Sequence, residues 1–324
     1  MNDFKNIAKS RELIFLFDAK DCNPNGERDT HASGPRIDRE TGRAIVTDLR
    51  IKRFVREYFL KTSNSKNENI LVKRDFIYNK QNEVKHFKDV FIDDLPFDEE
   101  TIKNLNEKQI YDSIAESFID HRLFGHLFEI SNNLYGITGP VQFETTFSLN
   151  KPYIIPITIT SALSSESTKG AGAMGQYHIL NYAIFPVHGI VKSSLARISK
   201  ATESDIGRLF DGLWDGLKTL NTRSKIGQTP RLLLSLVMKK PGYQIPRFRS
   251  IFDDYRVNEK LEDIQDVLFD LEQFKLLLGK FGNKIEYIEY REDPVLNYVI
   301  DKTEIQSITE ISDLIKNTPP FIEV

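Results

Sequence analysis

The sequence predicts an α+β fold of the ferredoxin-like class, in which one antiparallel sheet carries two helices on the same face. Two observations predict it. Once the longer insertions are set aside, the apolar patterns follow the order strand, helix, strand, strand, helix, strand. Both helical patterns also begin at a threonine suited to cap them, Thr47 and Thr202. The second face of the sheet and its loops are then expected to be free to bind.

The first strand and the first helix lie near the N-terminus. Residues 11–20, RELIFLFDAK, read as a strand that runs into the turn-rich stretch DCNPNGERD. The helix follows Thr47 because apolar residues recur at intervals of three and four from Ile51 to Phe59. The basic residues expected on or beside the polar face of this helix are Arg50, Lys52, Arg53 and Arg56.

The remaining elements follow later in the chain. Residues 141–150 and 176–191 alternate apolar and polar side chains, as strands do. The second helix begins at Thr202, with Asp205 three residues on in a capping box. Residues 230–239, PRLLLSLVMK, are then expected to form a buried strand.

Three segments fall outside this pattern. Residues 61–135 read as an insertion, and residues 150–175 as an excursion from the sheet with a Ser/Gly-rich tip. The chain from residue 253 to its end holds 17 acidic and eight basic residues, whereas residues 35–56 hold seven basic and three acidic ones. A basic region facing a polyanion is one interpretation, and ordinary solvated faces are the other.

Composition excludes several classes of protein. The chain has 324 residues, of which 40% are hydrophobic and 28% charged, as in ordinary globular proteins. The single cysteine, Cys22, excludes an internal disulfide framework and a cysteine-based zinc cluster. The apolar runs are too short to span a bilayer, so no membrane partner is expected and the predicted location is the cytoplasm.

A glycine motif in residues 169–182 raises the question of a dinucleotide site. Gly170, Gly172 and Gly175 have the spacing G-x-G-x-x-G. A dinucleotide fingerprint needs a strand before the glycines and a helix after them, because the helix N-terminus holds the phosphates. Here a Ser/Thr-rich tip precedes them and an alternating strand follows, so no cofactor is expected.

Six short stretches, in order between residues 15 and 234, carry a family resemblance. They are FLFDAKDCNPNGERD, GPRIDRETGRAIVTDLRIKRFVREYF, DHRLFG, GPVQFETTFSLN, MGQYHILNYAIFPVHG and LNTRSKIGQTPRLLL. In this combination the sequence resembles the CRISPR-associated Cas7 backbone subunits of type I effector complexes, specifically the type I-B (Csh-two or DevR-like) branch. The stretches span about two thirds of the chain and leave the 61–115 region and the acidic C-terminal part largely uncovered.

The resemblance implies a hand-shaped protein that polymerises along a CRISPR guide RNA in a Cascade complex. It assigns an RRM-like palm to residues 1–60 and 136–252, a fingers-like insertion to 61–135 and a β-hairpin thumb to 150–175, with an acidic part, 253–324, packing on the palm. The implied partners are the guide RNA, target DNA through guide pairing, further copies head-to-tail and other Cascade subunits. Cleavage would then belong to a recruited nuclease-helicase, and the chain itself would not be an enzyme.

Phosphate and ribose contacts need cations, amides and hydroxyls, which the matching stretches supply. The predicted RNA-binding residues are Asn23, Asn25, Arg36, Arg50, Lys52, Arg53, Arg56, Arg122, Lys169, Arg223, Ser224, Lys225 and Gln228. The alternatives are a solvated helix face for the first helix and a cation cluster at a helix C-terminus for residues 223–228. For Arg36 and Arg122 the alternative is an ion pair with a nearby aspartate.

Two other functions stay open at this point. A metal-dependent endoribonuclease of the same superfamily would use Asp38 or Asp29, although an aspartate after PRI is more often a turn or capping residue. The two histidines of HRLFGH match no common zinc spacing, so no metal site is predicted. An isolated RNA-binding module is the other alternative, and it predicts a single copy on RNA.

Overall fold

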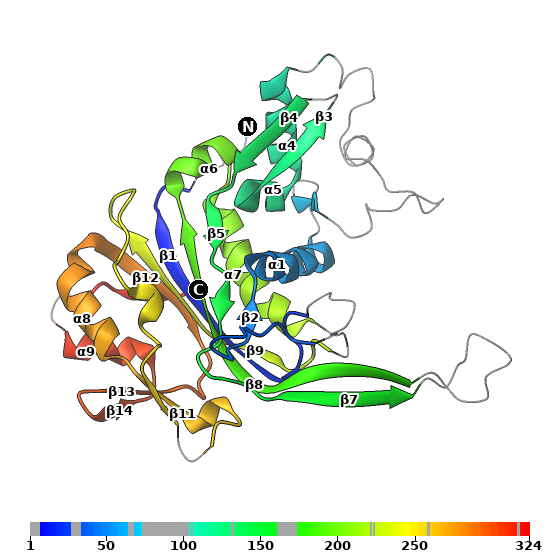
Figure 1. Ribbon diagram of the computed structural model, residues 1–324. Coiled ribbons are helices and arrows are strands. Elements are labelled where there is room, and N and C mark those ends of the chain that lie inside the picture. The colour runs from blue at the N-terminus through cyan, green and yellow to red at the C-terminus, as the bar shows by residue number, and fades with distance from the viewer. Residues whose placement is uncertain are drawn as a thin grey trace, which may run out of the picture.

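A central sheet organises the chain in the computed structural model (Figure 1). The structure describes residues 7–26, 34–63, 68–72, 104, 106–130, 133–160, 174–220, 222, 224–257, 260–315 and 318–324. Within them, the spatial order of the main sheet is β15 (Phe321–Glu323), β12 (Ile285–Glu292), β9 (Gln228–Met238), β1 (Arg11–Cys22), β8 (Met174–Val191) and β5 (Val141–Phe143). Strand β7 (Ile154–Thr160) also pairs with β8.

Strand β1 lies at the centre of this sheet and pairs antiparallel with both β8 and β9. Its LIFLF run is continuously apolar, which is typical of a strand buried on both faces. Alternate side chains point to opposite sides, so Phe15 and Phe17 join one core cluster while Ile14 and Leu16 join another. The sheet therefore separates two hydrophobic cores.

Two helices cover the first face, and both predicted caps are confirmed. Helix α1 (Asp48–Thr62) begins at Thr47, whose side chain accepts a hydrogen bond from the Arg50 amide. Helix α7 (Glu203–Lys218) begins at Thr202 in a capping box with Asp205. The order strand, helix, strand, strand, helix, strand is thus observed, with β5 and β8 as the middle pair.

The second face is not open, and the expectation of a free sheet face is wrong. The C-terminal elements lie over it, on the side opposite α1 and α7 (Figure 1). They bury Ile14 and Leu16 of β1 and Leu232 and Leu234 of β9 under side chains such as Phe248. The physical reason is that β1 and β9 are apolar at odd and even positions alike, so each face needs a cover.

The elements of this C-terminal cover are short. They are β10 (Tyr255–Val257), β11 (Val267–Asp270), α8 (Glu272–Phe281), β13 (Asn297–Ile300), β14 (Thr303–Ile305), α9 (Ile311–Leu314) and 3-10 turns at Phe248–Ser250, Ile264–Asp266, Gly282–Lys284 and Ile308–Glu310. Its core side chains point to the sheet, whereas acids such as Asp253, Glu262 and Glu304 are exposed. The acidic excess of this part is therefore largely a surface property.

The insertion and the excursion add two further features. The insertion contains α4 (Glu107–Ser117), α5 (Ile119–Phe124), β3 (Gly125–Ile130) and β4 (Asn133–Thr138), followed later by α6 (Ser193–Ser199). The predicted strand 141–150 is two short strands, β5 and β6 (Thr146–Phe147), and β6 pairs with β2 (Ile45–Val46). In the excursion, β7 and the first part of β8 form a two-stranded ribbon that projects from the sheet (Figure 1).

No helix in the described part of the chain is long and apolar enough to cross a membrane.

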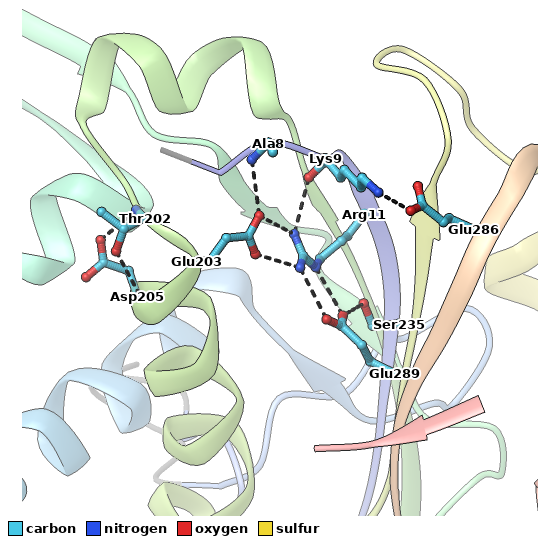
Figure 2. Close-up of polar contacts among 9 residues, drawn as sticks. All are labelled: Ala8, Lys9, Arg11, Thr202, Glu203, Asp205, Ser235, Glu286 and Glu289. Atoms are coloured by element: carbon cyan, nitrogen blue, oxygen red, sulfur yellow. Dashed lines mark hydrogen bonds and ion pairs between the residues drawn. The ribbon is translucent and has the colours of Figure 1, made fainter. Parts of the chain in front are cut away.

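A buried ion network holds the layers together at the first residue of β1 (Figure 2). The Arg11 guanidinium donates to Glu289 of β12 at 3.0 Å and to Glu203 in the first turn of α7 at 2.7 Å. Ser235 of β9 donates to the same Glu289 carboxylate at 2.8 Å. These contacts raise the pKa of Arg11 even though burial opposes its charge.

Close approach of α1 and α7 depends on two glycines of α7. A Cβ on Gly212 would lie 2.9 Å from Val55 Cγ1, and a Cβ on Gly216 would lie 3.1 Å from the Phe54 carbonyl oxygen. Gly207 lies on the same helix, but nothing is within 4 Å of its Cβ position. The backbone contact at residues 212–216 therefore fixes where α1 sits over the sheet.

We predict opposite effects for two Gly→Ala substitutions in α7. Gly212→Ala overpacks the contact with Val55, which costs about 1–3 kcal/mol and outweighs the gain in helix propensity. Gly207→Ala gains that propensity alone and stabilises the protein by up to about 1 kcal/mol. Urea unfolding followed by circular dichroism measures both, and equal stabilisation by the two would contradict the packing argument.

Candidate nucleic-acid interface

A basic cleft of about 670 Å³ opens where β1 ends, between the start of α1 and the loop that leads into β9. Five cationic side chains line it, and Glu57 is the one acid among its lining residues in the described part of the chain. The lining residues are Asn25, Gly26, Arg36, Thr47, Leu49, Arg50, Arg53, Glu57, Lys61, Thr219, Leu220, Thr222 and Lys225. An excess of positive charge in a concave site favours a polyanion.

The loop before β9 is held against the end of β1 by backbone hydrogen bonds. The Lys20 amide donates to the Gly227 carbonyl at 2.7 Å, and the Asn23 amide donates to the Ser224 carbonyl at 2.8 Å. Gly227 has a φ of +105°, and a Cβ there would lie 2.1 Å from the Lys20 carbonyl oxygen. Only glycine fits this position, so the loop has a fixed place beside the cleft.

Arg50 occupies the side of the cleft formed by the first turn of α1. Its Nε donates to the Pro24 carbonyl at 3.0 Å. Its Nη2 is buried and meets no hydrogen-bond partner among the described residues, and no carboxylate there pairs with it. Burial lowers the pKa of Arg50 to about 10. Arg50 as a whole is half-buried, so holding its charge there without an ion pair has a desolvation cost that a bound anion would offset.

Lys225 comes from the opposite side of the same cleft. Its Nζ donates to the Asn23 carbonyl oxygen, and in the described part of the chain no carboxylate pairs with it. Burial, reinforced by the charge of Arg50, lowers the pKa of Lys225 to about 8. Arg50 and Lys225 thus lie in the same cleft, and neither forms an ion pair with a carboxylate among the described residues.

The remaining predicted residues around the cleft play different parts. Arg36 reaches the Gly26 carbonyl at 3.5 Å, and no ion pair with an aspartate forms there among the described residues. Arg53 pairs with Glu57 at 2.7 Å and remains exposed. The Asn25 Nδ2 atom is buried and has no partner in the described part of the structure.

Asn23, Ser224 and Gln228 hold the loops in place. The Asn23 and Ser224 backbones bond to one another, and Gln228 Nε2 donates to the Lys225 carbonyl at 2.9 Å. The Asn23 Oδ1 atom is buried without a partner among the described residues. Arg223 and Lys169 lie outside the described residues, so their RNA-binding roles stay predictions.

Lys52 and Arg56, expected on or beside the polar helix face, do not line the cleft; Lys52 is buried and Arg56 half-buried rather than solvated. Lys52 Nζ bonds to Asp48 at 3.3 Å and to Gln142 at 3.2 Å. Arg56 Nε bonds at 2.8 Å to Asp120, which is fully buried. Asp120 belongs to the insertion. A buried carboxylate needs a cation beside it, and folding brings Arg56 to Asp120 from 64 residues away in the chain. Whether either residue reaches RNA stays untested.

Arg122 has the aspartate partner that was its alternative. Its Nε and Nη2 atoms bond to the two carboxylate oxygens of Asp205 at 2.9 and 2.8 Å, and both side chains are buried. Asp205 also completes the capping box of α7. The pair therefore joins the insertion to the second helix, and the geometry favours this structural role over a phosphate contact.

Glu57 and Lys61 line the cleft, although the sequence reasoning did not name them. Arg50, Arg53, Glu57 and Lys61 are spaced three, four and four residues apart, which places them on one face of a helix. That spacing was a usable signal. It also places Lys52 on the opposite face from Arg50 and Lys61, whereas Arg56 lies three residues from Arg53 and is not separated from it by spacing.

The residues considered for catalysis or metal binding have other surroundings. The Asp38 carboxylate accepts hydrogen bonds from the Thr41 hydroxyl and from the Glu40 and Thr41 amides, the last two at 3.3 and 3.2 Å, as a turn-capping residue does, and these contacts lower its pKa. Asp29 lies outside the described residues. His121 and His126 stack at 5.6 Å, and burial lowers their pKa values to about 3 and about 4. Within the described residues no cluster of three or more metal-ligating side chains occurs.

A family model described as CRISPR-associated protein Cas7 matches residues 9–275, which include every residue of the cleft. The chain belongs to the Cas7 family. It is 29% identical over 330 positions to the CRISPR-associated protein Cas7 of Haloferax volcanii, covering 91% of this chain and 90% of that protein. Membership of the Cas7 family, which the six sequence stretches indicated, is thereby confirmed, while the type I-B branch stays a prediction.

Two solved structures align with most of this Cas7 family chain. A chain from a CRISPR RNA-guided surveillance complex, pre-nicking, aligns over 97% of this chain and 96% of its own length, with a TM-score of 0.52 and 13% identity. A chain from a CRISPR RNA-guided surveillance complex covers 91% of this chain and 90% of its own, with a TM-score of 0.46 and 15% identity. The first of these supports a shared mixed α and β fold.

We predict that Arg122 and Lys225 differ sharply in their effect on stability. Arg122→Leu leaves the buried Asp205 carboxylate without its cation and lowers the free energy of unfolding by about 3–5 kcal/mol. Lys225→Met removes a desolvated ammonium that has no acid partner, so it changes stability by less than about 1 kcal/mol. Urea unfolding near neutral pH measures both, and a large loss with Lys225→Met would contradict the assignment of Lys225 to a binding site.

Proposed function

We propose that this Cas7 family chain is a non-catalytic guide-RNA-binding subunit that polymerises along the CRISPR RNA to form the backbone of a type I-B Cascade complex. One observation carries the proposal. Arg50 and Lys225 are partly buried in one cleft without a carboxylate partner among the described residues. An RNA phosphate supplies the negative charge that would neutralise these two cations.

The chemistry of the cleft suits a backbone contact that does not depend on sequence. Arg36, Arg50, Arg53, Lys61 and Lys225 are donors, and donors of this kind bind phosphate oxygens rather than base edges. A guide held by its backbone keeps its bases available for pairing with target DNA. Presenting the guide, rather than reading it, is the role we infer for this chain.

We propose that the hand-shaped division of the family applies here. Residues 1–60 and 136–252 would form the RRM-like palm, and the neighbour order β9, β1, β8, β5 supports this because it is the strand order of a ferredoxin-like sheet. Residues 61–135 would be the fingers and 150–175 the thumb, whose base is the β7–β8 ribbon. With one sheet face covered by residues 253–324, RNA would lie at the strand ends.

Further partners follow from the same proposal. Copies of the chain would contact one another head-to-tail, and other Cascade subunits would cap the filament. A recruited nuclease-helicase would act on the target DNA, in the cytoplasm. A head-to-tail contact that does not close on itself extends into a filament, and this is what following an RNA requires.

We expect the double variant Arg50→Gln with Lys225→Gln to weaken binding of a guide RNA by at least about tenfold, because two phosphate contacts are lost. The slope of log K against log salt should fall by about 1.4, since each single-strand phosphate contributes about 0.7. Fluorescence anisotropy across a salt series measures both quantities.

The matched control is Lys239→Gln with Lys240→Gln. This variant removes the same charge from two exposed lysines after β9, at the strand end far from the cleft. It should change the salt slope much less than the cleft variant. If both double variants lower the slope equally, the effect is one of net charge and the cleft is not the binding site.

The backbone role predicts that the number of bound copies rises stepwise with RNA length. Native mass spectrometry of the protein with RNAs of increasing length would show one added copy per fixed increment. An isolated RNA-binding module would remain at one tightly bound copy on each RNA, and that result would contradict the filament.

We predict no cleavage of a matched target RNA when the protein is incubated with guide RNA and Mg²⁺. The engagement of Asp38 in its own turn supports this expectation. Gel analysis of labelled target RNA is the measurement. Cleavage that disappears in Asp38→Ala would replace the non-catalytic role with an endoribonuclease.

A further inference from the structure

We propose that filling the basic cleft with a nucleic-acid phosphate is coupled to the uptake of one proton by Lys225. The inference rests on the proposed function, because it concerns the same cleft. It adds a regulatory property: the strength of RNA binding then depends on pH through this single lysine.

The described contacts of Lys225 do not include a negatively charged group that would stabilise its ammonium form. The Nζ atom donates to the Asn23 carbonyl oxygen, and no carboxylate pairs with it in the described part of the chain. The loop that carries Lys225 is held against β1, and the residue is half-buried. A neutral amine tolerates this position better than an ammonium does.

The groups that face Lys225 come from α1 and β1. Helix α1 contributes the cations Arg50 and Arg53, together with Glu57, whose carboxylate is already bonded to Arg53 at 2.7 Å. Strand β1 contributes Cys22, and burial raises the pKa of its thiol to about 12, so it stays neutral near physiological pH. Positive charge therefore outweighs negative charge around the amine.

The sign of the coupling follows from this charge balance. Burial and the charge of Arg50 lower the pKa of Lys225 to about 8, whereas the pKa of Arg50 is about 10 and keeps that residue charged at pH 8 to 9. A bound phosphate favours the ammonium form and raises the pKa of Lys225 again. The proton is taken from solvent as RNA binds, so affinity falls as pH rises through about 8.

The test measures RNA affinity between about pH 7 and about pH 9 at constant ionic strength, where the coupling predicts a loss of about tenfold. The probe is a labelled oligoadenylate, because adenine does not titrate in this range. Full-length wild type is compared with Lys225→Arg, which stays charged throughout. Lys240→Arg is the control, since it makes the same exchange at an exposed site outside the cleft. Lys225→Met, which has no titrating group, is a second test if the arginine does not fit.

Wild type and Lys240→Arg should lose affinity over this range, while Lys225→Arg and Lys225→Met show no such dependence whatever their affinity at neutral pH. Calorimetry at the alkaline end, in two buffers of different ionisation enthalpy, should show proton uptake in wild type and Lys240→Arg and none in the two Lys225 variants. A wild-type pH dependence that survives in both Lys225 variants overturns the coupling and leaves the cleft as the RNA site. If Arg50→Gln and Lys225→Met both bind RNA as wild type does near pH 7, the proposed function of the cleft fails and the coupling fails with it.

Discussion

Burial of β1 on both faces is the constraint on which the rest of the structure depends. Alternate side chains of this strand enter two separate hydrophobic cores, one under α1 and α7 and the other under the C-terminal elements. Neither face can then hold charged groups without a large desolvation cost. A charged side chain within the strand is therefore paired, as the buried Asp18 is with Arg231 at 2.9 Å, and the cleft cations that have no carboxylate partner among the described residues lie where the strand ends.

Positive charge is paired with carboxylates at one end of β1, whereas two half-buried cations at the other end have no such partner in the described part of the chain. At the start of the strand, Arg11 lies between Glu289 and Glu203, so its charge is neutralised and the contacts join the sheet to helix α7 (Figure 2). At the other end, Arg50 and Lys225 share a cleft with no such acid between them. A charge that is paired stabilises the fold, whereas a charge that is left unpaired in a cleft is available for a ligand.

Helix α1 also carries two kinds of cation. Arg50 and Arg53 line the cleft, whereas Lys52 and Arg56 form hydrogen bonds with Asp48 and Asp120. The glycines of α7 allow the close helix contact that fixes this orientation. Because the two kinds differ in their partners and not in residue type, a basic helix of the Cas7 family can carry structural and ligand-facing cations within a few residues.

The sequence by itself determined the chain order of strands β1, β5, β8 and β9 and of the two helices that cover them, both helix caps and the family, because capping and apolar periodicity act over a few residues and the motifs are local. It also named Arg50 and Lys225. Only the tertiary structure decided which cations are free. Arg56 and Arg122 meet aspartates 64 and 83 residues away in the chain, and the sheet face is covered by segments beyond residue 243. Such ion pairs form because folding buries an aspartate that then needs a cation beside it, and a local sequence pattern does not show which aspartate will be buried.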